Sequence, residues 1–313
     1  MKQGATATKS VVITGASSGI GRATAIRLAG NGWRVFATVR ENADGEALIA
    51  AARGALEAVV LDVRDRESIA AAAREVEARL AGRGLDGLFN NAGIGIVAPV
   101  ECTPPEALRE LYEINLFGQI GVTAAFLPLV RKANGRIVNM GSVGDHIAPP
   151  FAGAISSSKA AFASMSQALR LELRTQGICV CLIEPGSINT PAIEKTLGGV
   201  EKTIAALPAD AAALYGEPMR RMAKTFTANE RAGSPPEAVA KVVERALTDR
   251  NPATRYLVGK DAAKLVILAR FLPEKFLDIA ILKKFGLSPQ FGKPANAASV
   301  SLPSPGRSPE TFG

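Results

Sequence analysis

A glycine-rich turn near the start of the chain has the spacing of a phosphate-binding loop. The apolar run Val11–Thr14 is followed at once by a turn and then by a helical pattern. Glycines let the backbone turn sharply and approach a pyrophosphate, while the free amides of a helix N-terminus hold the anion. This context predicts dinucleotide binding, with a glycine-rich turn that has no ligand as the alternative. The expected binding residues are Gly15, Ser17, Ser18, Gly19, Ile20 and Gly21.

The end of the second expected strand indicates which dinucleotide is bound. Proteins that bind NAD usually place an acidic residue here, where it holds the ribose 2′-hydroxyl. This chain has Val39 followed by Arg40, whose planar guanidinium can pair with a 2′-phosphate, with Ser17 as a second donor. We therefore predict NADP rather than NAD, with NADPH bound about tenfold or more tighter than NADH. The alternative for Arg40 is a solvated surface arginine.

Short β-branched runs alternate with alanine-rich stretches along most of the chain. Strands are expected at Val11–Thr14, Arg34–Val39, Ala58–Leu61, Gly87–Asn90, Arg136–Met140, Ile178–Glu184 and Arg255–Val258. Helices are expected at Ile20–Ala29, Gly45–Ala52, Arg66–Leu80, Pro104–Arg131, Ser157–Thr175 and Pro235–Thr248. Most of the strands are continuously apolar, which is typical of strands covered on both faces. The alternation predicts an α/β fold with one doubly wound parallel sheet, a Rossmann fold.

Three segments depart from this alternation. Residues 190–230 have a helical pattern and follow the carboxyl end of a strand, so they could form a lid over the site. We expect a single Rossmann domain over residues 1–260, followed by an amphipathic helical extension over 261–285 that breaks at Pro273. The Ser/Pro/Gly/Ala-rich tail, residues 286–313, is expected to be disordered.

Composition excludes several classes of protein. The chain has 313 residues, 47% of them hydrophobic and 21% charged, which suits a large buried core. Three cysteines are too few for a disulfide framework, and the single histidine, His146, cannot build a histidine-rich metal site, so no metal is expected. The net charge of +8 is modest and without a long basic block, which argues against nucleic acid. With no signal peptide or long apolar run recognised, a cytoplasmic location is expected.

Further motifs follow the turn in a fixed order. Together they resemble the short-chain dehydrogenase/reductase family over about Ser10 to Gly259. The motifs are the turn Thr14–Gly21, the pair Asp62-Val63, the stretch Asn90-Asn91-Ala92-Gly93, and the residues Asn115, Ser142, Lys159, Pro185, Gly186 and Thr190. The Ala-Thr-Val-Arg end of the second strand and the long C-terminal segment most resemble the hydroxysteroid and retinol branches.

The resemblance implies a role for each motif. Asp62 and Val63 would lie beside the adenine, and Asn91, Ala92 and Gly93 would line the cofactor site. Pro185, Gly186 and Thr190 would contact the nicotinamide amide. In the catalytic set, Asn115 would support a proton-relay water, Ser142 would stabilise the reacting oxygen, and Lys159 would hold the nicotinamide ribose. Relatives also pair subunits through the helices expected at Pro104–Arg131 and Ser157–Thr175, so a homo-oligomer is expected.

The catalytic set lacks its proton donor. In the family this donor is a tyrosine four residues before the lysine, and Ile155 occupies that position here. Isoleucine cannot supply a proton to the oxygen of a reduced carbonyl, and losing a general acid typically costs about 10²–10⁴-fold in rate. Lys159 or a water near Asn115 could still supply a proton. Four less favoured substitutes are Tyr112, Tyr215, Ser156 and His146.

The residues near the serine predict an apolar pocket, although core packing would explain the same residues. Residues 147–155 are mostly apolar, which favours a hydrophobic small-molecule substrate. We therefore expect an NADP-dependent oxidoreductase that interconverts a hydrophobic alcohol and a carbonyl compound, slowly or atypically. The alternatives are a non-catalytic NADP-binding sensor or partner subunit, and a peripheral lipid binder. Residues 264–285 could pack on their own domain, pair subunits, or contact an anionic membrane.

Overall fold

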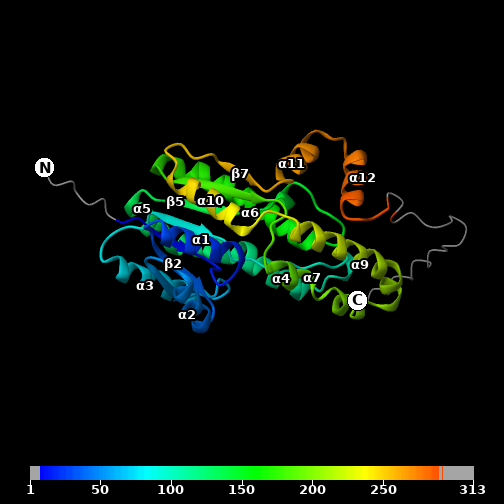
Figure 1. Ribbon diagram of the computed structural model, residues 1–313, viewed down its shortest axis with the longest axis horizontal. Coiled ribbons are helices and arrows are strands. Elements are labelled where there is room, and N and C mark those ends of the chain that lie inside the picture. Colours follow the sequence, from blue (N-terminus) through cyan, green and yellow to red (C-terminus); the bar gives the residue numbers. More distant parts are fainter. Residues whose placement is uncertain (1–7, 289–290, 292–313) are drawn as a thin grey trace, which may run out of the picture.

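A seven-stranded parallel sheet forms the centre of the molecule. Figure 1 shows the computed structural model of the chain, which describes residues 8–288 and residue 291. The strand order is β3-β2-β1-β4-β5-β6-β7, so the chain winds outward in both directions from β1. The strands are β1 (Ser10–Ile13), β2 (Arg34–Val39), β3 (Leu56–Val60), β4 (Gly87–Asn90), β5 (Arg136–Met140), β6 (Cys179–Pro185) and β7 (Arg255–Val258). The predicted fold class and all seven predicted strands are confirmed.

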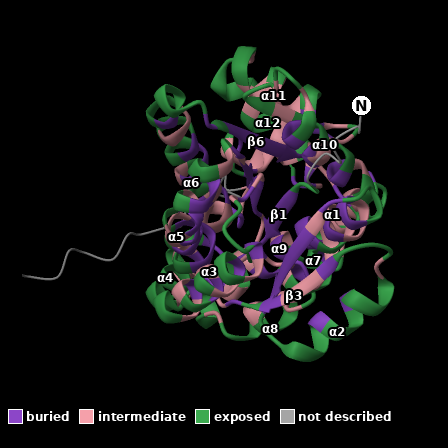
Figure 2. Ribbon diagram, turned by 90° about the vertical axis from the view of Figure 1, so that its left-hand side faces the viewer, coloured by how far each residue is buried: buried purple, intermediate pink, exposed green. Residues whose placement is uncertain are grey.

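Helices cover both faces of the sheet and bury two separate apolar layers (Figures 1 and 2). One layer contains residues of α1 (Gly19–Gly30), α2 (Asn42–Ala51) and α10 (Pro236–Thr248). The other contains residues of α3 (Arg66–Leu80) and α5 (Gly118–Ala133), with α6 (Gly153–Glu172) alongside. The Asp65 carboxylate accepts the Glu67 amide at 2.8 Å and caps α3, as its position before that helix predicted.

Two helices near the predicted site differ from their expected bounds. The single helix expected at 104–131 is α4 (Pro105–Tyr112), a π-helical turn (Glu113–Phe117) and then α5. The helix expected from Ser157 begins at Gly153, because the Ala152 carbonyl already accepts the Ser156 amide at 3.0 Å. Ile155 and Lys159 therefore lie one turn apart on the same helix. Three short 3₁₀ turns occupy Val100–Cys102, Val143–Asp145 and Leu173–Gln176.

The predicted lid and extension form a third apolar cluster beside the sheet. The lid contains α7 (Ala192–Leu197), α8 (Val200–Ala205) and α9 (Ala209–Arg231), and the extension contains α11 (Ala262–Phe271) and α12 (Glu274–Lys284). Phe285 and Leu287 are buried in this cluster, so the ordered chain continues past the predicted start of the tail at residue 286. Most of the segment predicted to be disordered lies outside the described residues.

One helical stretch of the described chain, residues 105–133, is long and apolar enough to cross a membrane. Its second half is α5, in which Val122, Phe126 and Val130 are fully buried against the sheet. The stretch is therefore accounted for as a core helix of the domain.

Candidate active site

The cofactor crevice begins where the chain changes direction between β1 and β4. Thr14 follows β1, and its hydroxyl accepts the Asn91 and Ala92 amides at 2.8 and 3.0 Å. The Asn91 side chain donates back to the Thr14 and Gly15 carbonyls at 2.9 and 3.1 Å. These bonds join the glycine turn to the stretch after β4. The opening lies at the topological switch point, where sheets of this kind bind their ligands.

The turn has the shape of a phosphate cradle. Gly15 and Gly19 have φ of +63° and +54°, a region that L side chains rarely adopt. A Cβ at Gly21 would lie 2.3 Å from the Gly15 carbonyl oxygen, so this position requires glycine. Arg22 is the first residue of α1 whose amide bonds back to a carbonyl, that of Ser18 at 3.2 Å. The preceding amides point out of the helix end, so the predicted turn fits a pyrophosphate.

The adenosine end of the crevice carries the arginine that the sequence singled out. Arg40 is exposed just after β2 and makes no hydrogen bond or ion pair with the described residues. Asp62, after β3, instead pairs with Arg64 at 2.6 Å. Hydrogen bonds from Arg64 hold the pKa of Asp62 below its usual value, and the nearby charge of Arg40 acts in the same direction. Arg40 therefore keeps its guanidinium free for an anionic ligand.

Ser142, Ile155 and Lys159 line one cavity, which holds about 830 Å³ of empty space out to its open mouth. Its walls are mostly apolar and come from the loop after β5, α6, the lid and the extension. The Ser142 hydroxyl accepts the Gly144 amide at 3.0 Å, which leaves its own proton free to donate to a ligand oxygen. The structure therefore brings together the predicted serine and lysine, with Ile155 beside them.

Lys159 is a titratable group that lines this cavity beside Ser142. Its ammonium donates to the Met140 carbonyl at 2.8 Å, which leaves two further N–H donors. Burial lowers the pKa of Lys159 to about 8, although the charge of Asp145 acts in the opposite direction. A group with this pKa is protonated near neutral pH and can still release its proton, as a general acid must.

Asn115 lies in the π-helical turn and connects two parts of the site. Its side-chain oxygen accepts the Ile94 amide at 2.9 Å, while its amide group donates to the Ile94 carbonyl at 2.9 Å and to the Ser158 hydroxyl at 3.0 Å. A Cβ at Gly93 would lie 3.1 Å from that oxygen and 3.8 Å from the Lys159 amine nitrogen. Asn115 therefore fixes the Gly93 stretch beside Lys159, and its part in a water relay remains a prediction.

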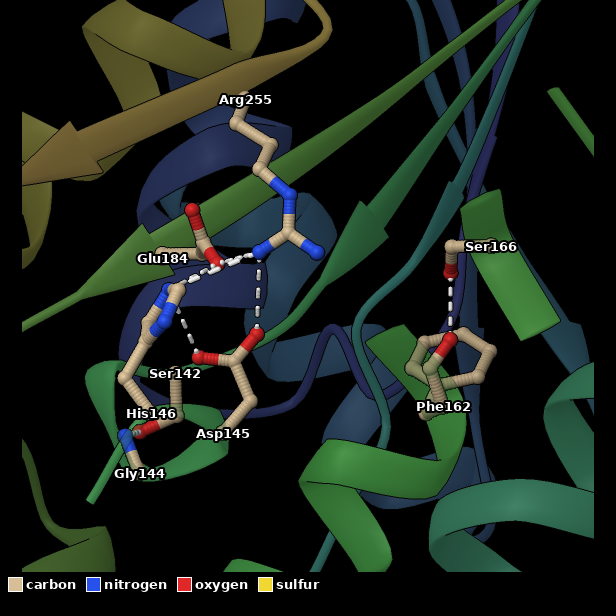
Figure 3. A network of polar contacts seen from close by, with 8 residues as sticks. All are labelled: Ser142, Gly144, Asp145, His146, Phe162, Ser166, Glu184 and Arg255. Carbon is tan, nitrogen blue, oxygen red and sulfur yellow. Dashed lines mark hydrogen bonds and ion pairs between the residues drawn. The ribbon is translucent and has the colours of Figure 1, made fainter. Parts of the chain in front are cut away.

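An ionic network around the buried carboxylates of Asp145 and Glu184 supports the loop that carries Ser142 (Figure 3). His146 contacts Glu184 at 3.0 Å and Asp145 at 3.3 Å, and Arg255 pairs with both carboxylates. Burial raises the pKa of Asp145 to about 7, whereas hydrogen bonds from His146 and Asp145 oppose the effect of burial on Glu184 and keep its pKa low. The ligand atoms of Asp145, His146 and Glu184 lie within 4.8 Å of one another, but the Arg255 guanidinium already pairs with both carboxylates. The arrangement suits a proton-sharing network better than a cation site.

The loop after β6 is held by the start of the extension. A Cβ at Gly186 would lie 2.2 Å from an Asp261 carboxylate oxygen, so glycine is required for this approach. Asp261 accepts the amide and the hydroxyl of Ser187, both at 3.1 Å, and pairs with Lys284 at 3.0 Å. Thr190 lies farther along the loop, 3.4 Å from the position of a Cβ on Gly19. Pro185, Gly186 and Thr190 thus border the predicted cofactor crevice.

The substitutes for the missing tyrosine differ in their positions. Ser156 lines the cavity. The Tyr215 hydroxyl donates to Glu101 at 2.5 Å and His146 belongs to the ionic network, so both are already engaged. Tyr112 is not among the residues that line the cavity. Of these substitutes, only Ser156 shares the cavity with Ser142 and Lys159.

The model of the short chain dehydrogenase family matches residues 9–198 of this chain. The chain belongs to the short-chain dehydrogenase family. Human retinol dehydrogenase 5 is 35% identical over 281 residues, 87% of each chain, and 17-beta-hydroxysteroid dehydrogenase type 6 of Rattus norvegicus is 37% identical over 285 residues, 86% of each. A short-chain dehydrogenase structure from Streptomyces avermitilis superposes with a TM-score of 0.71 at 31% identity, covering 90% of this chain and 97% of that one. The resemblance to the hydroxysteroid and retinol branch is thereby confirmed.

Two supporting residues of this short-chain dehydrogenase were missed in the sequence. Gln119 donates to the Ala92 carbonyl at 2.9 Å and accepts the Thr14 hydroxyl at 3.4 Å, so it supports the floor of the crevice. Asp261 supports the loop after β6. Neither belongs to a motif, but a glutamine in an otherwise apolar helix is a usable signal because a buried amide needs partners.

Proposed function

We propose that this short-chain dehydrogenase is an NADP(H)-dependent oxidoreductase that interconverts a hydrophobic alcohol and its carbonyl compound, more slowly than relatives that have the tyrosine donor. One observation carries the proposal: Ser142 and Lys159 line one apolar cavity together with Ile155, which stands where the family pattern would place a tyrosine. Retinol and hydroxysteroid dehydrogenases among the relatives support a lipophilic substrate.

The residues of the crevice fit an NADP cofactor in three places. The glycine turn and the end of α1 would bind the pyrophosphate, and the free guanidinium of Arg40 would pair with the 2′-phosphate. Lys159 lies beside Gly93, where it would hold the nicotinamide ribose. When bound, NADPH would supply the hydride for reduction of the carbonyl carbon.

Lys159 takes over the acid role in this proposal. Ser142 donates its free proton as a hydrogen bond to the carbonyl oxygen and stabilises the negative charge that develops there. Lys159 then transfers a proton to that oxygen, since burial has brought its pKa to about 8. In alcohol oxidation the same neutral amine accepts the proton. Ile155 contributes only apolar surface, which is why the reaction is slow.

Single-turnover oxidation of NADPH against steroid, retinoid and aliphatic carbonyl compounds tests this proposal. We expect slow turnover with at least one lipophilic carbonyl and a loss of about 10²-fold or more in Ser142→Ala, the scale of one oxyanion donor. Ser164→Ala is the matched control, because this serine is exposed on α6. NADPH binding without turnover of any carbonyl would instead support the non-catalytic alternative, which the isoleucine favours.

We also propose that the enzyme forms a homo-oligomer through the outer faces of α4, α5 and α6. Phe117, Met165 and Leu171 are all at least 46% exposed on this side of the molecule. Sedimentation velocity would show a dimer or tetramer that Phe117→Ser weakens. A cytoplasmic location remains an expectation, and the three free cysteines accord with a reducing compartment.

A further inference from the structure

Two carboxyl groups are buried at the turn that carries Ser142. Asp145 comes from that turn and Glu184 from β6, and their side chains are only 4% and 1% exposed. Figure 3 shows the two groups facing each other, and their oxygen atoms lie within 4.8 Å. Like charges this close oppose each other's ionisation. No step of the proposed reaction uses this pair.

Charged groups face Asp145 from several elements packed around its turn. Arg255 from β7 and His146 on the turn itself each contact the Asp145 carboxylate at 3.3 Å, and Glu184 faces it from β6. The helix α11 also packs on this turn, but none of its charged residues forms an ion pair with Asp145. Because Arg255 balances one of the two carboxylates, the charge of this cluster depends on whether Asp145 holds its proton.

Lys159 approaches the same turn from α6. Its ammonium donates to the Met140 carbonyl at 2.8 Å, at the end of β5, and the turn that follows is closed by a bond from the Asp145 amide to the Ser142 carbonyl at 3.1 Å. Lys159 forms no ion pair with any residue that the structure describes. A buried ammonium without a counter-ion loses its proton readily, and the charge of Asp145 opposes this loss.

We propose that Asp145 is a positioning residue for the acid step, because its carboxylate keeps Lys159 protonated at a pH where burial alone would discharge it. The assignment to the acid step rests on the proposed function, whereas the coupling between the two side chains does not. The order of the two titrations suits this role. The pKa of Asp145 is about 7 and that of Lys159 about 8, so Asp145 is already largely ionised where Lys159 begins to lose its proton.

Competitive labelling with acetic anhydride tests the coupling without any turnover. Mass spectrometry would follow acetylation of the Lys159 amine against pH, with a midpoint expected near pH 8. Asp145→Asn should lower this midpoint by about 0.5–1 pH unit, and Asp145→Glu, which keeps the charge, should restore it. The control is Asp249→Asn, which removes a carboxylate paired with Arg245 at 3.6 Å and should leave the midpoint unchanged. An unchanged midpoint in Asp145→Asn would overturn the proposal.

The single histidine of the chain provides a second test that leaves Asp145 in place. The His146 ring contacts Asp145 at 3.3 Å, so its NMR resonances should report the ionisation of that carboxyl group. Coupling between two sites is reciprocal. Lys159→Met should therefore raise the pH at which Asp145 ionises by the same amount as Asp145→Asn lowers the labelling midpoint. Identical histidine titrations in the parent and Lys159→Met would also overturn the coupling.

Kinetics then separate the coupling from the proposed function. The alkaline fall of the single-turnover reduction rate should move with the labelling midpoint in Asp145→Asn and return in Asp145→Glu. A labelling midpoint that moves while the alkaline fall stays in place would overturn the role of Asp145 in the acid step. A moving midpoint with no turnover of any carbonyl compound would leave the coupling intact and count against the proposed function alone.

Discussion

Replacing Ile155 with tyrosine should restore a fast reductase. Ile155 and Lys159 are one helical turn apart on α6 and line the same cavity, so a tyrosine ring would extend toward the lysine and Ser142. The Lys159 cation would favour ionisation of the new phenol and bring its pKa closer to neutrality. Ile155→Tyr would thus add the proton donor that the resemblance to the family implies at this position.

The expected gain follows from the chemistry of general acids. A positioned acid contributes about 10²–10⁴-fold, which corresponds to roughly 2.7–5.5 kcal/mol of barrier. The ring would extend into the apolar cavity that Ile155 lines together with Ser142 and Lys159. Gly95 leaves room beside position 155, because a Cβ at Gly95 would lie only 3.1 Å from the Ile155 Cδ1 atom.

Ile155→Phe is the matched control, since it has the same ring without the hydroxyl. Single-turnover NADPH oxidation with one lipophilic carbonyl should be 10²–10⁴-fold faster in the tyrosine variant than in the parent, and no faster in the phenylalanine variant. Calorimetry should show that all three proteins bind NADPH similarly. Equal rates for the tyrosine and phenylalanine variants, with cofactor binding intact, would refute the assignment of this active centre.

Three further predictions address the acid, the cofactor and the ionic network. Because burial lowers the pKa of Lys159 to about 8, the single-turnover reduction rate should fall about tenfold per pH unit above pH 8. The Lys159→Arg variant should be slower, and its rate should show no such fall above pH 8, because arginine stays protonated. In calorimetry, Arg40→Leu should weaken NADPH binding about tenfold or more and leave NADH binding unchanged. An equal loss of affinity for NADPH and NADH would show that Arg40 does not bind the 2′-phosphate. Arg255→Leu should lower the free energy of unfolding by about 1–3 kcal/mol in urea titrations, since the buried carboxylates of Asp145 and Glu184 lose a partner that is itself partly exposed. A change below about 0.5 kcal/mol would show that solvent reaches these carboxylates.

The sequence predicted the sheet well because its strands are buried on both faces. Continuous apolar runs such as residues 179–183 of β6 stand out against the alanine-rich helices, and the glycine turn fixes the position of the first crossover. The start of α6 was harder to predict from the sequence, because the helix begins at Gly153 without a side-chain cap to mark it. The π-helical turn around Asn115 likewise continues a helical pattern without interruption, so the periodicity cannot reveal it.

The parts of the site that escaped prediction depend on contacts between distant segments. Arg255 meets Asp145 across 110 positions of sequence, and only the order of β5, β6 and β7 brings them together. The predicted role of Arg40 needed no such contact, because the arginine follows its strand directly. Local motifs were therefore enough to predict a cofactor crevice, while the supporting network became visible only in the folded chain.

The bonds of Asp261 also bear on where the domain ends. The predicted boundary at residue 260 falls just before this carboxylate, which holds the Ser187 amide at the cofactor crevice and the Lys284 ammonium at the far end of the extension. Both helices of the extension are thereby tied to one loop, and a chain cut at the boundary would lose the anchor of that loop. A change in the position of the extension should therefore change the rate at which NADPH leaves the crevice. Stopped-flow measurements of NADPH release would detect this change.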